Sequence, residues 1–268
     1  MARSIGLVDD KVAEADFFLE ELGKRGFDLF AARCYFNAFV SASRSITFSL
    51  QAVMSDIDGF SNWYEIRQDE LKGNELARFF VTARNLTQKI GEHPVTAGSM
   101  RATPNGAEVE LRFSVSHDFP AVPSDDVVTA CRAYLSMLVD LVLSCYEQFG
   151  RVVDPDQYYT AEAFAERGLT IDDADEEVIG IRGWTCVPGV PEEARWQMLR
   201  DSVPGCEIDE LFEMYAGRTR PTPERVLPKE RPAQGWVYIP DELRVTGDPE
   251  EDVRRFIAKL QARSVRWP

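Results

Sequence analysis

Apolar residues recur at three- and four-residue steps through most of the first 150 residues, which predicts a mainly α-helical protein. The stripes predict helices at about residues 10–24, 27–55, 60–71, 75–90 and 125–149. Four of them, all except 60–71, are expected to pack as an antiparallel helical bundle, because each has one apolar face to bury. Asn74 and Ser124 precede two of these helices as N-caps, and Gly91 with Pro94 ends the 75–90 helix.

One segment has the two-residue period of a β-strand instead. Apolar and polar residues alternate without interruption from Ala107 to Val115. Asn105-Gly106 precedes this run, and Asn-Gly favours a tight hairpin turn. Residues 95–103 are therefore the expected partner strand, and a β-hairpin insert at about 95–116 interrupts the bundle.

The chain changes character after Arg151, where acidic and proline residues become frequent. We divide it into a bundle, residues 1–151, and an acidic, Pro-containing accessory region, residues 152–268, with an irregular α+β fold. Trp184 and Trp236 are expected in the core of the accessory region, and the acidic run 172–177 is expected to be a solvated loop. Further elements are expected as short helices at about 160–167, 192–202, 207–216 and 248–264, strands at 178–181 and 236–239, and an extended connector over 219–235.

Composition favours a cytoplasmic protein with no membrane segment. No run approaches the ~20 consecutive apolar residues of a spanning helix, and the first ten residues turn acidic too early for a secretory signal. The five cysteines are scattered and include no Cys-x-x-Cys pair. Cys34, Cys131 and Cys145 lie in apolar helical stretches, where we expect buried, reduced thiols.

Charge restricts where an anionic partner could bind. The formal net charge is −15, whereas residues 24–101 hold ten basic and eight acidic residues and are net positive. Nucleic-acid binding depends largely on phosphate contacts, so RNA would bind residues 24–101 rather than the acidic remainder. The sequence has two histidines and none of the phosphate-loop, dinucleotide-binding, zinc-protease or serine-hydrolase motifs, so we expect no cofactor and no metal.

One constellation carries candidate catalytic chemistry: Arg84 to bind a phosphate, Asn85 to orient it and His93 to move a proton near neutral pH. In this arrangement the sequence resembles the HEPN superfamily of helical bundles, in which a late helix carries an Arg-polar pair followed by a His. The helix segment 31–42 resembles the corresponding early helix of that superfamily. The resemblance covers about residues 10–150, and it implies a homodimer and, in many members, metal-independent RNA cleavage at the dimer joint.

The spacing in this chain is longer than in the superfamily, where four to six residues separate Arg from His. Here eight residues separate Arg84 from His93, and nine helical steps of ~100° point the two side chains in opposite directions. A break in the helix at Gly91 would let the His93 side chain turn back towards Arg84. In the alternative interpretation, Arg84 and Asn85 make structural hydrogen bonds and His93 caps the helix end. His117, in the loop after the second strand, is a weaker candidate.

Three hypotheses of function follow. The favoured one is a non-catalytic interaction or scaffold protein with a protein partner; the alternative is a metal-independent ribonuclease or RNA-binding protein of a defence or toxin–antitoxin system. A small-molecule enzyme is a third, and no paired acid and base points to it. The aromatic residues of the helices, Phe60, Trp63, Tyr64, Phe79 and Phe80, are expected in the core or a dimer interface rather than as base-stacking platforms.

Overall fold

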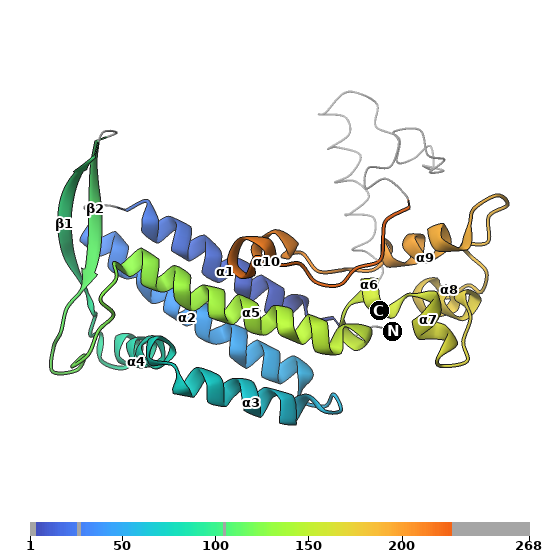
Figure 1. The fold of residues 1–268 in the computed structure, drawn as a ribbon, viewed down its shortest axis with the longest axis horizontal. Coiled ribbons are helices and arrows are strands. Elements are labelled where there is room, and N and C mark those ends of the chain that lie inside the picture. Colours follow the sequence, from blue (N-terminus) through green and yellow to red (C-terminus); the bar gives the residue numbers. More distant parts are fainter. Residues whose placement is uncertain (1–3, 26–27, 104–105, 227–268) are drawn as a thin grey trace, which may run out of the picture. The chain divides into compact units, whose positions relative to one another are not determined.

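The predicted stripes assemble into a mainly helical fold with one β-hairpin, as the sequence indicates (Figure 1). The computed structural model describes residues 4–25, 28–103 and 106–226. The bundle region contains α1 (Gly6–Gly23), α2 (Leu29–Met54), α3 (Phe60–Gly73), α4 (Glu75–Ile90), β1 (Val95–Thr103), β2 (Gly106–Phe113) and α5 (Val127–Val153). The following elements are α6 (Pro155–Tyr158), α7 (Ala161–Ala165), α8 (Ile171–Ile179), α9 (Glu192–Arg200) and α10 (Asp209–Ala216). The strand expected at 236–239, the helix at 248–264 and Trp236 lie outside the described residues.

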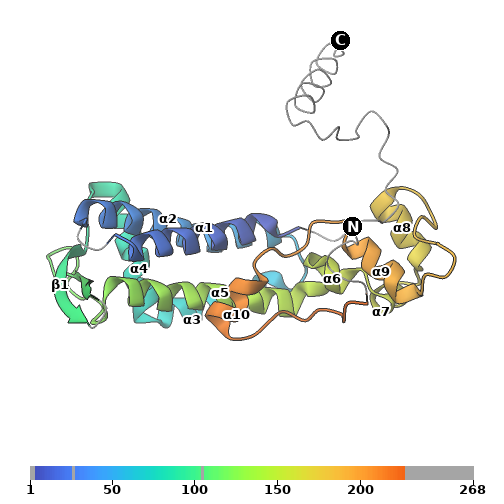
Figure 2. The ribbon, with the colours of Figure 1, turned by 90° about the horizontal axis from the view of Figure 1, so that it is seen from above.

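Helix α5 lies at the centre of the bundle. It packs against α1, α2, α4 and α10, and side chains on several of its faces are buried, from Val127 to Val153 (Figures 1 and 2). By its length and apolar composition, α5 would also qualify as a membrane-spanning helix. Core helices of globular proteins meet the same two criteria. Its N-cap is Asp126, not Ser124: the Asp126 carboxylate accepts from Val128 N and Thr129 N at 3.0 and 3.1 Å.

Helix α4 is positioned by its two ends. Asn74 Oδ1 accepts from Ala77 N at 3.1 Å, which confirms the predicted N-cap. Gly91 ends the helix in the left-handed region, with φ of 74°, a conformation that glycine adopts without steric cost. Between these ends α4 lies across the long helices rather than along them, and Phe79 and Phe80 enter the core (Figures 1 and 2).

The β-hairpin is tied to α2 and α4. Arg33 Nε on α2 donates to Val95 O at 2.9 Å, and the Phe113 ring lies 4.9 Å from that of Phe79 and 5.9 Å from that of Phe36. The register shifts between Thr96 and Ser99, where a Cβ on Gly98 would meet Glu110 O at 1.0 Å. Glycine is therefore required there.

The described part of the accessory region is helical and has a small core of its own. Tyr159, Phe164, Ile171, Trp196 and Leu199 form that core. The strand expected at 178–181 is wrong, because this segment is the end of α8 and the Gly180 turn that follows it. Trp184 is exposed, contrary to expectation.

The acidic run 172–177 belongs to α8 and is not a solvated loop. A capping box between Thr170 and Asp173 starts this helix. Asp175 is fully buried and accepts from Thr185 N and Oγ1 and from Arg195 Nη2, at 3.1 to 3.3 Å. These donors allow the carboxylate to be buried.

The cysteines follow the expectation in part. All five are unbridged, and Cys131 and Cys145 are buried in α5. Cys34 is exposed, because it lies on the solvent side of α2, next to the stripe rather than in it.

Helices α1 and α5 share a buried polar contact. Tyr146 donates its hydroxyl hydrogen to Asp9 Oδ2 at 2.8 Å, and Asp9 Oδ1 is buried without a hydrogen-bond partner among the described residues. Burial raises the pKa of Asp9 to about 7, and the Tyr146 hydrogen bond opposes that rise only in part.

The pH dependence of stability should reveal this contact. A carboxyl whose pKa is raised in the folded state stabilises the fold fully below its unfolded pKa, 3.8, and loses that contribution as pH rises through about 7. Relative to wild type, Asp9→Asn should therefore gain on the order of 3–4 kcal/mol of unfolding free energy between about pH 4 and pH 8. Urea unfolding at several pH values measures this, and a constant difference between the two proteins would contradict it.

A second buried polar group anchors the segment after α10. Arg220 donates to Asp154 Oδ2, Asp156 Oδ2 and Asp209 Oδ1 at 2.6 to 2.7 Å. Asp154 is fully buried, and burial raises its pKa although Arg220 opposes the rise. The charge of Asp154 thus depends on Arg220 for compensation.

Removal of this guanidinium should be costly. Arg220→Met leaves Asp154 buried and unpaired, and we expect a loss of ~3–5 kcal/mol of unfolding free energy. Arg225→Met is the matched control, since the pair of Arg225 with Asp201 is substantially exposed and should contribute less than ~1 kcal/mol. Denaturant unfolding compares the two variants, and equal losses would mean that the Arg220 contacts do not hold the segment.

Candidate functional site

The residues singled out from the sequence lie at the contact between α2 and α4. Arg84 is half-buried on α4, and its Nη1 donates to Asn85 Oδ1 at 3.3 Å. Arg84 Nε is buried without a hydrogen-bond partner. One of the five N–H groups of this guanidinium therefore donates to the next residue on the same helix.

His93 lies beyond the helix end, after the left-handed Gly91. Its Nδ1 is buried without a partner, and burial lowers the pKa of the imidazole, with the charge of Arg33 as the next cause. Within the described part of the chain, no hydrogen bond joins His93 to Arg84. Arg33 of α2 is anchored two residues beyond His93, where its Nε donates to Val95 O at 2.9 Å.

Arg33, Asn37 and Ser41 form a polar stripe on α2, and Ser41 joins this stripe to Gln88 of α4. The three α2 residues are four positions apart and therefore share one face of the helix. Gln88 Nε2 donates to Ser41 Oγ at 2.7 Å, and Asn37 Oδ1 is buried without a partner.

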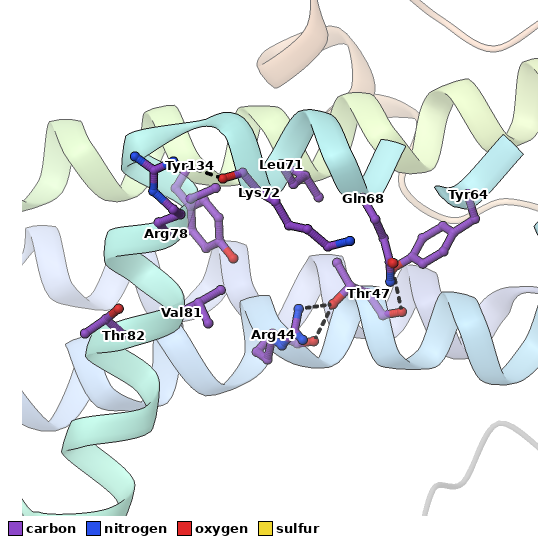
Figure 3. A pocket seen from close by; sticks show the side chains of 11 residues that line it. Arg44, Thr47, Tyr64, Gln68, Leu71, Lys72, Arg78, Val81, Thr82 and Tyr134 are labelled. Carbon is purple, nitrogen blue, oxygen red and sulfur yellow. Dashed lines mark hydrogen bonds between the residues drawn. The ribbon is translucent and has the colours of Figure 1, made fainter. Parts of the chain in front are cut away.

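A cavity of about 340 Å³ lies further along the same face, where α3 and α4 pass over α2 and α5 (Figure 3). Its polar lining comes from all four helices: Arg44 and Thr47 of α2, Tyr64, Gln68 and Lys72 of α3, Arg78 and Thr82 of α4, and Tyr134 of α5. The sequence reasoning missed this group. The spacing of Arg44 from Ser41, Asn37 and Arg33 along one polar face of α2 is the signal that could have indicated part of it.

The cations of this cavity differ in how their charge is compensated. Lys72 Nζ lies 2.8 Å from Asp69, and Arg78 Nη2 lies 4.0 Å from Glu75, both on the exposed side. Arg44 has no carboxylate partner in the described ranges. Its Nη1 donates to Thr47 Oγ1 at 3.1 Å, and its guanidinium lies 4.3 Å from the Phe48 ring centroid.

Tyr134 supplies a buried hydroxyl to the cavity. Only 4% of this residue is exposed, and its ring stacks on Phe80 with centroids 4.5 Å apart. The hydroxyl points into the cavity (Figure 3), and no hydrogen bond to another described residue occupies it. Burial raises the pKa of Tyr134 to about 12, although the charge of Arg44 opposes this, so the hydroxyl remains a hydrogen donor.

The remaining candidates lie elsewhere. The His117 side chain is fully exposed, 3.5 Å from Asp118. Across residues 4–25, 28–103 and 106–226, no group of three or more His, Cys, Asp or Glu side chains is arranged to hold a metal ion. Phe60, Tyr64, Phe79 and Phe80 are core residues, as expected, and Trp63 is partly buried against them.

Comparison with known proteins adds one similarity. Residues 5–100 match the family model described as bacteriophage lambda protein ea47, which is less than half of the chain. The match includes α1 to α4, and with them Arg44, Arg84 and His93, but not Tyr134 on α5. No curated protein and no solved structure gives a match.

The proximity of Arg33 to His93 can be measured directly. The His93 pKa should lie below the ordinary 6.5, and Arg33→Gln should move it upward without restoring it fully, because burial remains. NMR titration of the two imidazoles gives this value, with His117 as the reference signal that the substitution should not alter. A His93 pKa unchanged by Arg33→Gln would show that the two residues are not near each other.

Proposed function

We propose that this chain is a non-catalytic helical interaction protein, a scaffold that binds another protein. The proposal rests mainly on the separation of the candidate catalytic groups. Arg84 donates to Asn85, whereas the cation whose charge lowers the pKa of His93 is Arg33. A phosphate-binding group and a general base must instead converge within ~2.6–3.2 Å of neighbouring substrate atoms.

The distribution of exposed apolar side chains supports a protein partner. Leu7, Phe17 and Phe30 of the α1–α2 pair are 66%, 55% and 80% exposed. Aromatic side chains are enriched where proteins bind one another. The homodimer implied by the HEPN resemblance belongs to the same proposal, since a second copy is one protein that could cover such side chains.

RNA binding or cleavage is the second candidate, and one observation favours it. Arg33, Arg44 and Arg84 all lie on the α2–α4 side of the bundle, in the part of the chain that is net positive. A neutral His93 beside Arg33 also has the chemistry of a base next to a phosphate-binding group. In this second candidate function, the phosphate-binding residue would be Arg33 rather than Arg84.

Cleavage of a mixed RNA pool in the presence of EDTA tests the proposal. Wild type and Arg84→Ala should both leave the RNA intact. Arg84→Ala should also lower the melting temperature by about 2–4 °C, the effect of ~1 kcal/mol lost from a half-buried hydrogen bond. Arg132→Ala, at an exposed position of α5, is the matched control for removal of an arginine.

Two results would overturn the scaffold proposal. RNA degradation by wild type that Arg84→Ala abolishes, at an unchanged melting temperature, would establish the Arg84 site as catalytic. Degradation that survives Arg84→Ala but is lost in both Arg33→Gln and His93→Ala would establish the site at Arg33.

A further inference from the structure

The cavity between α2, α3, α4 and α5 has several cationic and neutral hydrogen donors on its polar side. Arg44 contributes guanidinium N–H groups, Lys72 an ammonium group and Tyr134 a hydroxyl that stays protonated. No carboxylate lines it. Lys72 and Arg78 each have an acid close by outside the lining, whereas Arg44 has no carboxylate partner among the described residues and is the cation free to bind an oxyanion.

Arg44 is held ready for such a ligand. Thr47 Oγ1 accepts from Arg44 Nη1 and donates to Arg44 O at 3.0 Å, so the side chain is fixed near its own backbone. Tyr64 donates to Thr47 O at 3.4 Å and closes the same corner (Figure 3). A guanidinium fixed in this way loses little conformational entropy when it binds a carboxylate or phosphate.

Tyr134 provides the second, independent observation. Its ring is buried in the bundle, its hydroxyl is aimed into the cavity, and among the described side chains and backbone groups that hydroxyl has no acceptor. The hydroxyl is therefore available to donate to an acceptor of a ligand in the cavity.

The cavity also has an apolar side. Leu71, Ala77 and Val81 line it, next to the polar side chains of Gln68 and Thr82. The volume, about 340 Å³, is at the lower end of the ~300–1,000 Å³ typical of small-molecule sites and is larger than a lone inorganic ion requires.

We propose that this cavity binds a small organic anion, with its carboxylate or phosphate head on Arg44 and the Tyr134 hydroxyl and its apolar body against Leu71 and Val81. Lys72, at the exposed rim, attracts the head through its charge and contributes less to the bound state. The site is independent of the protein–protein role proposed above, since it does not use the exposed side chains of α1 or the start of α2.

Calorimetric titration of the full chain with three probes of matched body tests this: phenyl phosphate, benzoate and uncharged benzyl alcohol. At least one anion should bind with a dissociation constant of ~1 mM or tighter, and at least tenfold more tightly than benzyl alcohol. Preference for phenyl phosphate or for benzoate then identifies the head group.

Substitutions locate the site. Arg44→Gln should weaken anion binding about tenfold or more, and Tyr134→Phe, which keeps the stacked ring, about threefold to tenfold. Tyr35→Phe and Arg132→Gln are the matched controls outside the cavity, and both should bind as wild type does. Lys72→Gln, at an exposed position that cannot unfold the chain, should give a smaller loss that disappears at high salt.

Three results would overturn the proposal. The first is the absence of binding by either anion at about 10 mM probe. The second is binding of benzyl alcohol as tight as that of the anions, which would make the cavity merely apolar. The third is anion binding that folded Arg44→Gln, Tyr134→Phe and Lys72→Gln proteins all retain unchanged, which would place the anion elsewhere.

Discussion

Burial of α5 is the constraint on which the rest of this structure depends. A helix of 27 residues with apolar side chains on several faces can be covered only if other elements surround it, and α1, α2, α4 and α10 do so. Two tyrosines of α5, Tyr134 and Tyr146, are consequently buried as well. Tyr146 needs Asp9 as its acceptor, and the Tyr134 hydroxyl is left facing a cavity. The raised pKa of Asp9 and the candidate ligand site therefore both follow from the burial of one apolar helix.

The crossing of α4 over the long helices separates two regions that the sequence places close together. The Asn74 cap and the left-handed Gly91 fix where α4 begins and ends, and its tilt opens the cavity on one side of the contact with α2. On the other side the chain returns along α2, so that His93 approaches Arg33. The distance along the sequence from Arg84 to His93 thus gives no guide to their relation in space.

Local signals were sufficient for most of the fold, and long-range contacts account for the failures. Helices α2 and α4 and the hairpin were predicted almost residue for residue, because periodicity, an Asn cap and an Asn-Gly turn act over a few positions. Helix α8 was missed because five acids in six residues resemble a solvated loop, and the donors that satisfy Asp175 come from Thr185 and Arg195. The cavity could not be predicted, since Arg44 and Tyr134 are 90 positions apart in elements whose crossing no short pattern encodes.

The contact between Asp9 and Tyr146 spans 137 positions of the chain, and this has a consequence during synthesis. At ~5–20 residues per second, a ribosome needs roughly 7–27 s to progress from one residue to the other. Helices α1 and α2 can pair soon after they emerge, but their surfaces for α5 stay uncovered throughout that interval. Slow translation of the β-hairpin and the loop before α5 would prolong the exposure of these apolar surfaces.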